Sequence, residues 1–325
     1  MKSKELFQAL FNKQEVARPL YIPLICSFAA KLRQVTVPKL FSNPTVYANS
    51  LRDAYRLFGF DAMVTSFDPT LEAEALGCGI QWEQEDQLPR VVSHPLAEGQ
   101  GFANLEREWE KKGRIPVVME ATKRLTMLLS KEAAIIGTIA GPFTLAAQLR
   151  GDPFFTELRE DTPYCNELIN FAGQCGLKLA NLYSELNVDG LFVIENHFHK
   201  IKNISSINKL ASALRPFSNL LEHFGIPLIL LARGCSKEQI ALISILPAKG
   251  LILDIQPDEH TQNPDRCIAA TVPSEQLLDD AGLFRETLDN LLEEGHFFLS
   301  NDWEIPYHTP VPNIYEIMKR IKNSE

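Results

Sequence analysis

The sequence of 325 residues lacks the features that mark several protein classes. No apolar run approaches the roughly 20 residues that cross a bilayer, and no signal-peptide core follows the first residues. Basic charge is also scarce: 32 lysines and arginines stand against 41 aspartates and glutamates, which gives a formal net charge of −9, and no basic cluster occurs. We therefore expect a cytoplasmic protein that binds neither membranes nor nucleic acid.

Paired cysteines and a glycine-rich loop are missing as well. The six cysteines are scattered without a Cys-x-x-Cys pair, which argues against a zinc ribbon or a disulfide scaffold and suits reduced thiols. No Gly-x-Gly-x-x-Gly motif follows the first predicted strand, which counts against a dinucleotide-binding doubly wound sheet. What is present is an ordinary globular composition, with 45% hydrophobic and 22% charged residues.

Short apolar segments alternate with helical segments along most of the chain. Eight of them are predicted as buried strands: 20–26, 61–66, 133–139, 190–194, 227–231, 251–255, 267–272 and 296–300. Helices precede the second strand, and residues 80–95 predict a small inserted β-hairpin, followed by a helix over 102–112. Buried strands that alternate with helices in a chain of this size favour a single (β/α)8 TIM barrel domain over residues 1–325. A doubly wound open sheet is the alternative.

A carboxylate follows the second predicted strand. Pro69 cannot donate to a sheet, so the chain leaves the sheet there and Asp68 lies at the carboxyl edge of the strand. Barrels of this class carry their chemistry at that edge, which makes Asp68 a candidate catalytic residue. The alternative is that Asp68 only caps the helix that follows.

The same rule selects side chains after the other strands: Glu195, His197, His199, Arg233, Cys235, Asp254, Asp302, Trp303 and Glu304. An arginine among carboxylates pairs with one of them or with an anionic ligand, so Arg233 is predicted to grip a substrate carboxylate or phosphate. Trp303 is predicted to form a flat apolar wall of the same cavity as Asp68. The alternative is that Trp303 packs into the rim and Arg233 points to solvent.

Three motifs lie in order over almost the whole chain: DPTLEAEALG at 68–77, GPFTLA at 141–146 and IPYHTPVPN at 305–313. With them the sequence resembles the uroporphyrinogen decarboxylase superfamily. That superfamily contains the decarboxylases of haem biosynthesis and the cobalamin-dependent methyltransferases that pass methyl groups from a corrinoid protein to coenzyme M or related acceptors. The resemblance implies a (β/α)8 barrel.

The decarboxylase branch implies residues that are mostly missing here. Its loop after the first strand carries paired arginines, whereas residues 24–28 contain none. Gln148 stands at the position of its tyrosine and Trp303 at that of its histidine, and only Asp68 is retained. Since the substrate is a polycarboxylate, a buried site without those cations disfavours uroporphyrinogen decarboxylation.

The methyltransferase branch is favoured by the local sequence EAEALG at 72–77, which resembles that branch. Its members hold zinc with a His-x-Cys motif after the strand that is here 227–231 and with a cysteine before the last motif. Ala232, Gly234 and Trp303 stand at those positions, so we predict no zinc in the usual three-ligand arrangement and no tightly bound cofactor. The alternative is a rebuilt zinc site from donors in neighbouring loops: Cys235, Glu195, His197 and His199.

The leading interpretation is a uroporphyrinogen decarboxylase-like, corrinoid-linked methyltransferase that acts on a small polar acceptor. A corrinoid protein is the expected partner and would carry the methylcobalamin. Catalysis is assigned to Asp68, Glu195 and His197, and substrate binding to Arg233, Trp303, Asp302, Gln148 and His199. Two alternatives stay open, a divergent uroporphyrinogen decarboxylase of porphyrin biosynthesis and a barrel that binds a ligand or a corrinoid protein without catalysis.

Overall fold

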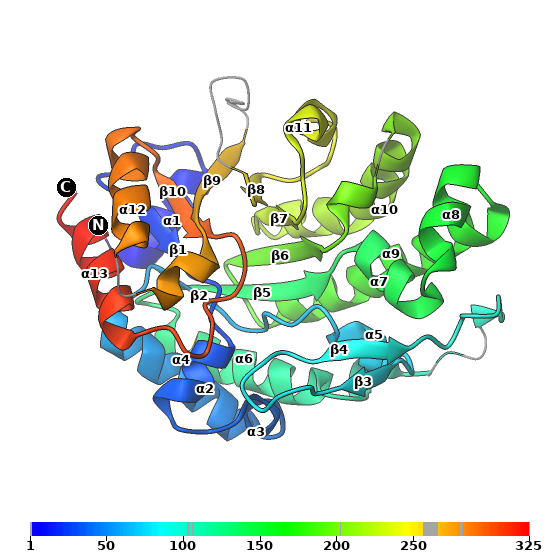
Figure 1. Cartoon of the computed structure of the whole chain (residues 1–325), viewed down its shortest axis with the longest axis horizontal. Coiled ribbons are helices and arrows are strands. Elements are labelled where there is room, and N and C mark those ends of the chain that lie inside the picture. Colours follow the sequence, from blue (N-terminus) through cyan, green and yellow to red (C-terminus); the bar gives the residue numbers. More distant parts are fainter. Residues whose placement is uncertain are drawn as a thin grey trace.

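The computed structural model describes residues 2–102, 105, 107–201, 203–255, 266–279 and 282–324. Its main sheet has eight parallel strands in the order β1-β10-β9-β8-β7-β6-β5-β2 (Figure 1). The strands curve into a nearly closed barrel with helices between them, so the predicted (β/α)8 fold is confirmed.

The strands are short and deeply buried. They are β1 (Leu20–Ile22), β2 (Ala62–Val64), β5 (Ala134–Ala140), β6 (Gly190–Glu195), β7 (Leu228–Ala232), β8 (Gly250–Leu253), β9 (Cys267–Val272) and β10 (Phe298–Asn301). The predicted hairpin is present as the antiparallel pair β3 (Gly79–Gln81) and β4 (Arg90–Ser93).

Helices connect and cover the strands. They are α1 (Ser3–Phe11), α2 (Ser27–Leu32), α3 (Val37–Phe41), α4 (Pro44–Phe58), α5 (Leu71–Ala75), α6 (Ile115–Leu129), α7 (Pro142–Arg150), α8 (Pro153–Glu160), α9 (Pro163–Glu185), α10 (Ile204–His223), α11 (Lys237–Ile243), α12 (Leu283–Glu293) and α13 (Val311–Lys322). None of the helices in the described part of the chain combines the length and apolar character needed to cross a bilayer.

Some element boundaries differ from the prediction. The first strand ends at Ile22, because Pro23 cannot donate to the ladder. The helix predicted over 102–112 falls partly outside the described residues, and the described part holds only the 3-10 turn Trp109–Lys111. Helix α8 was not predicted, although Pro153 stands at its first position, where a proline suits a helix.

Asp61 bridges β1 and β2, the two ends of the sheet order. Its buried carboxylate accepts hydrogen bonds from Ser3 Oγ at 2.8 Å, from Arg18 Nη2 at 2.6 Å and from the main-chain nitrogen of Tyr21 at 3.1 Å. A charged acceptor with a paired guanidinium satisfies the backbone donor at the seam where the ladder is interrupted. Asp61 directly precedes β2 and so lies at the amino end of the strands, opposite the end at which a barrel binds its ligands.

The β3–β4 hairpin and the segment after it are fastened to the carboxyl end of α7. The main-chain nitrogen of Leu96 donates to the carbonyl of Leu149 at 3.0 Å, and Arg150 Nη1 donates to the carbonyl of Leu96 at 2.6 Å. The first bond satisfies a carbonyl group that the end of α7 leaves without a helical partner. The insertion is therefore held as a wall beside the carboxyl ends of the strands.

Candidate functional site

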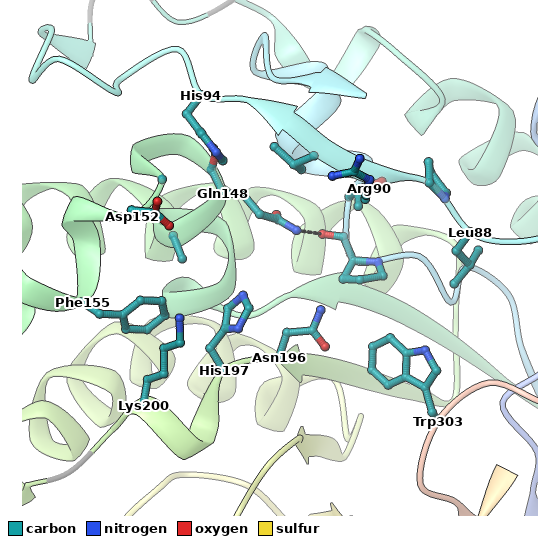
Figure 2. Close-up of a pocket in the computed structure, with 16 residues that line it drawn as sticks. Leu88, Arg90, His94, Gln148, Asp152, Phe155, Asn196, His197, Lys200 and Trp303 are labelled. Carbon is teal, nitrogen blue, oxygen red and sulfur yellow. Dashed lines mark hydrogen bonds between the residues drawn. The ribbon is translucent and has the colours of Figure 1, made fainter. Parts of the chain in front are cut away.

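A cleft of about 440 Å³ opens at the carboxyl end of the barrel, between the hairpin, α7 and the loops after β2, β6 and β10 (Figure 2). Its lining consists of Pro69, Thr70, Leu88, Pro89, Arg90, Val91, His94, Ala147, Gln148, Gly151, Asp152, Phe155, Asn196, His197, Lys200 and Trp303. The volume suits a small molecule. Three of the residues predicted from the sequence, Gln148, His197 and Trp303, meet in this cleft.

Gln148 ties two walls of the cleft together. Its side-chain nitrogen Nε2 donates to the carbonyl of Pro69 at 2.9 Å, a bond that Figure 2 draws as a dashed line. A carbonyl only accepts, so this bond fixes which end of the amide faces Pro69. The other end, Oε1, is buried and has no hydrogen-bond partner. Gln148 Oε1 is therefore an acceptor of the cleft whose orientation is fixed and whose partner is missing.

His94 lies on the opposite side of Gln148, after the hairpin. Its Nδ1 is 2.6 Å from the main-chain carbonyl of Gln148, and it must donate there because the carbonyl cannot. The neutral ring consequently carries its lone pair on Nε2. Gly151 leaves room for this ring: a Cβ at that position would lie 2.8 Å from His94 Cδ2, and the φ of +76° also favours glycine.

His197 forms the floor of the cleft beside Asn196. Burial, followed by the charges of Lys200, His199 and Arg233, lowers the pKa of His197 to about 4, so the ring is neutral near pH 7. It packs edge-on against Phe155, with ring centroids 5.5 Å apart. A neutral imidazole of this kind donates or accepts hydrogen bonds but holds a proton weakly.

Trp303 closes the side of the cleft that lies over the barrel centre. Phe67 packs edge-on against it at 4.9 Å between centroids, and the guanidinium of Arg233 stacks on its ring at 4.2 Å. Arg233 itself is exposed and is not part of the cleft lining. Its predicted grip on a substrate anion in one cavity with Asp68 is therefore not the arrangement found.

Asp68 lies beneath the cleft floor rather than in it. Its side chain is fully buried and forms an ion pair with Arg114, which also donates to Glu74 at 2.7 Å. The other oxygen of Asp68 accepts from the main-chain nitrogen and the hydroxyl of Thr70, each at 2.8 Å. These partners hold the loop between β2 and α5 in place, but none of them is a main-chain nitrogen of α5, which begins at Leu71.

Glu195 faces the amino end of α7. Its carboxylate accepts from the main-chain nitrogens of Phe143 at 3.0 Å and Thr144 at 2.9 Å, and from the Thr144 hydroxyl at 2.9 Å. Burial raises the pKa of Glu195 to about 7. Gly141 is needed for this contact, since a Cβ there would lie 2.3 Å from the carboxyl carbon. Both oxygens of Glu195 thus serve the helix end, and the residue is not part of the cleft lining.

The remaining predicted residues lie outside the cleft. Asp302 accepts from the main-chain nitrogen of Ser274 at 2.7 Å, and the exposed His199 packs against Gly234. Cys235 is buried, and burial raises the pKa of its thiol to about 12, so the thiol keeps its proton. Among the residues that the structure describes, no group of three histidine, cysteine or acidic side chains converges as a metal site.

The zinc ligands that the resemblance implies do not fit this chain. At the three corresponding positions stand Ala232, which is fully buried, Gly234, and Trp303, which is stacked between Phe67 and Arg233. None of these side chains offers a donor of the kind that binds zinc. No step of the chemistry is therefore assigned to a metal at these positions.

Sequence reasoning missed several residues of the lining, above all His94, Asn196 and Lys200. His94 follows the hairpin and not a barrel strand, so the rule of strand ends could not select it. Asn196 and Lys200 flank the predicted His197 in the same loop, and their place beside it was a usable signal. Lys200 Nζ lies 4.7 Å from the centre of the Phe155 ring, at the edge of the cleft.

Comparisons with known proteins agree with this architecture. Methylcobamide:CoM methyltransferase MtbA from Methanosarcina acetivorans is 29% identical over 198 residues, which make up 59% of this chain and 57% of that relative. A uroporphyrinogen decarboxylase from Jannaschia sp. is 24% identical over 226 residues, or 66% of this chain and 65% of that relative. The matched segment thus spans little more than half of the methyltransferase.

The fold also matches over its full extent. A solved structure described as a methyltransferase from Methanosarcina mazei superposes with a TM-score of 0.86 at 19% sequence identity, covering 99% of both chains. The model of the family uroporphyrinogen decarboxylase (URO-D) matches residues 2–324. With nearly every residue inside that match, the chain belongs to the uroporphyrinogen decarboxylase family.

Proposed function

We propose that this chain is a methyltransferase that moves a methyl group from a corrinoid to a small polar acceptor bound in the cleft. The observation that carries the proposal is the 29% identity to MtbA, whose name describes methyl transfer from a methylcobamide to coenzyme M. The cleft supports it, because 440 Å³ at the strand ends has room for a small acceptor but not for a whole corrinoid as well.

The cleft geometry suggests how the two reactants meet. Gln148 and His94 line one wall, Trp303 another and His197 the floor (Figure 2). A small acceptor would fill this space, while the corrinoid, carried by a partner protein, would approach from the open mouth. The corrinoid would supply a methyl group on cobalt. The residues of this chain would hold the acceptor with its nucleophilic atom toward the mouth.

A divergent decarboxylase is less well supported. Residues 24–28, where paired arginines would hold a polycarboxylate, contain no arginine and are buried. Arg90 and Lys200 are the cations among the lining residues, and Arg90 already forms an ion pair with Glu83. Several carboxylates in this cleft would be left without counter-charges.

The proposal is tested with the full-length protein, methylcobalamin and coenzyme M, by following the absorbance change as methylcobalamin is demethylated. We expect transfer by the wild type and a loss of about tenfold in Gln148→Leu at low acceptor concentration, because one buried acceptor is removed. Glu120→Gln, on the exposed side of α6, is the control and should not change the rate. Absence of transfer to any small thiol would refute the methyltransferase, and turnover of uroporphyrinogen would favour the decarboxylase.

A further inference from the structure

His94 is the histidine of the cleft whose ring orientation is fixed by the fold. The carbonyl of Gln148 holds Nδ1 as a donor at 2.6 Å, and the ring lies over Gly151, with both residues in the cleft lining. The hairpin segment that carries His94 is fixed in turn by Leu96 and Arg150 at the end of α7. Nε2 is left as the acceptor of a held ring, which is the arrangement of an oriented general base.

The cleft also lacks a donor for Gln148 Oε1. This atom is buried, its orientation is fixed by the bond from Nε2 to Pro69, and no described residue donates to it. A buried acceptor without a partner costs free energy unless a ligand supplies a donor. Gln148 Oε1 and His94 Nε2 therefore both favour a ligand that carries an S–H, O–H or N–H group.

His197 is less suited to accept a proton. Its pKa is lowered to about 4 by burial and by Lys200, His199 and Arg233, so it releases a proton readily and takes one up poorly near pH 7. Ala232, Gly234 and Trp303 offer no ligands for a metal that would lower the pKa of an acceptor thiol. The proton of the acceptor needs another destination, and the fixed ring of His94 lines the same cleft.

We propose that His94 is the general base that deprotonates the methyl acceptor bound in the cleft; this rests on the proposed methyl transfer. For a thiol, the S–H bond breaks as its proton moves to His94 Nε2. The sulfur electron pair then forms the new S–CH3 bond, while the electron pair of the Co–CH3 bond stays on cobalt, which goes from Co(III) to Co(I). The proton later leaves His94 for water, so atoms and charge balance.

The test separates the two functions of the ring. In His94→Asn the side-chain amide nitrogen can still donate to the Gln148 carbonyl in place of Nδ1, but the amide has no basic atom that takes up a proton as Nε2 does. His94→Ala removes both, and unfolding of the three proteins shows which change is structural. His296→Asn, a histidine paired with Glu294 far from the cleft lining, is the matched control.

The first readout needs no corrinoid: the ultraviolet absorbance of the thiolate of bound coenzyme M at fixed neutral pH. We expect the wild type and His296→Asn to raise the thiolate fraction on binding, and His94→Asn to bind the thiol without ionising it. Equal thiolate fractions in wild type and His94→Asn would overturn the proposal, and so would a failure of the wild type to bind coenzyme M.

The second readout is methyl transfer to ethanethiol and to the more acidic trifluoroethanethiol. His94→Asn should lose about 100-fold in rate with ethanethiol, the size of a general-base contribution, and much less with trifluoroethanethiol, which ionises without help. Equal losses with both thiols would assign His94 a positioning role instead. If the wild type ionises bound thiol but transfers no methyl group to it, the proposed function fails while the inference about His94 stands.

Discussion

Asp68→Asn should destabilise the protein strongly, because Asp68 is half of a buried ion pair. The side chains of Asp68 and Arg114 are 0% and 10% exposed. Removing one partner of such a pair costs about 3–5 kcal/mol, since the remaining charge stays buried without compensation. Here Glu74 still pairs with Arg114 at 2.7 Å, and asparagine can still accept from Thr70, so we expect about 2–3 kcal/mol.

Urea unfolding of the purified variant measures this cost as a change in the free energy of unfolding. Asp53→Asn is the matched control: its ion pair with Arg33 at 2.7 Å is exposed, with 39% of the Asp53 side chain accessible, and it should cost less than about 1 kcal/mol. Arg114→Met keeps an apolar stem beside the rings of Phe41 and Trp82, over which the guanidinium lies. The double variant with Asp68→Asn should lose less than the sum of the single variants.

The outcome distinguishes a structural carboxylate from a catalytic one. A structural Asp68 lowers stability while the folded variant keeps most of its methyl-transfer rate. If Asp68→Asn instead unfolds at the same urea concentration as the wild type and has lost its turnover, the main role of Asp68 is not to stabilise the fold through the ion pair. The catalytic role predicted for Asp68 from the sequence would then be restored, and the assignment to His94 would need to be withdrawn.

Three further predictions follow from the same geometry. Burial raises the pKa of Glu304 to about 8 and of Glu195 to about 7, so between pH 7 and 8 the folded state binds more protons than the unfolded state. The free energy of unfolding should therefore rise as the pH falls from 8 to 7, by up to about 1.4 kcal/mol per group, and should change less with pH in Glu304→Gln. Urea titrations in which the free energy of unfolding falls over this pH range would contradict the prediction. Gly151→Ala should cost about 1–3 kcal/mol, because φ is +76° and the new Cβ would meet His94, and an unchanged melting curve would show that the ring can move aside. Metal analysis after dialysis should find far less than one zinc per chain, unchanged in Cys235→Ser, whereas stoichiometric zinc lost in that variant would establish the rebuilt site.

Most of the barrel could be predicted because its strands are buried on both faces. The segment of residues 134–140 is apolar except for Thr138 and is buried along its whole length, so it must be covered by helices. The errors concern places where a few residues determine where a strand or helix begins or ends. Pro23 ended the first strand early, and the short helix α8 was not predicted although Pro153 stands at its first position.

The candidate site was harder to predict. The rule of strand ends places a residue at the carboxyl end of the barrel, but it does not say in which direction the side chain points. Glu195 ends β6, yet its side chain turns to the amino end of α7, where it accepts three hydrogen bonds. Asp68 lies in the loop after β2 and its side chain turns to Arg114, which lies 46 residues further along the chain. A polar side chain at a strand end is drawn to whichever buried donors lie nearest, and one sequence does not show where those are.

The position of the cleft follows from how the barrel centre is closed. Trp303 stands where the resemblance implies a zinc ligand or a catalytic histidine, and its ring, with Phe67 at its edge and Arg233 on its face, covers the mouth at that point. The open space that remains lies under the hairpin and beside α7. Side chains of these two elements face that space together with those of the loop after β6. Because the large aromatic Trp303 covers the position where relatives carry their chemistry, the segment of the inserted hairpin with His94 becomes part of the site.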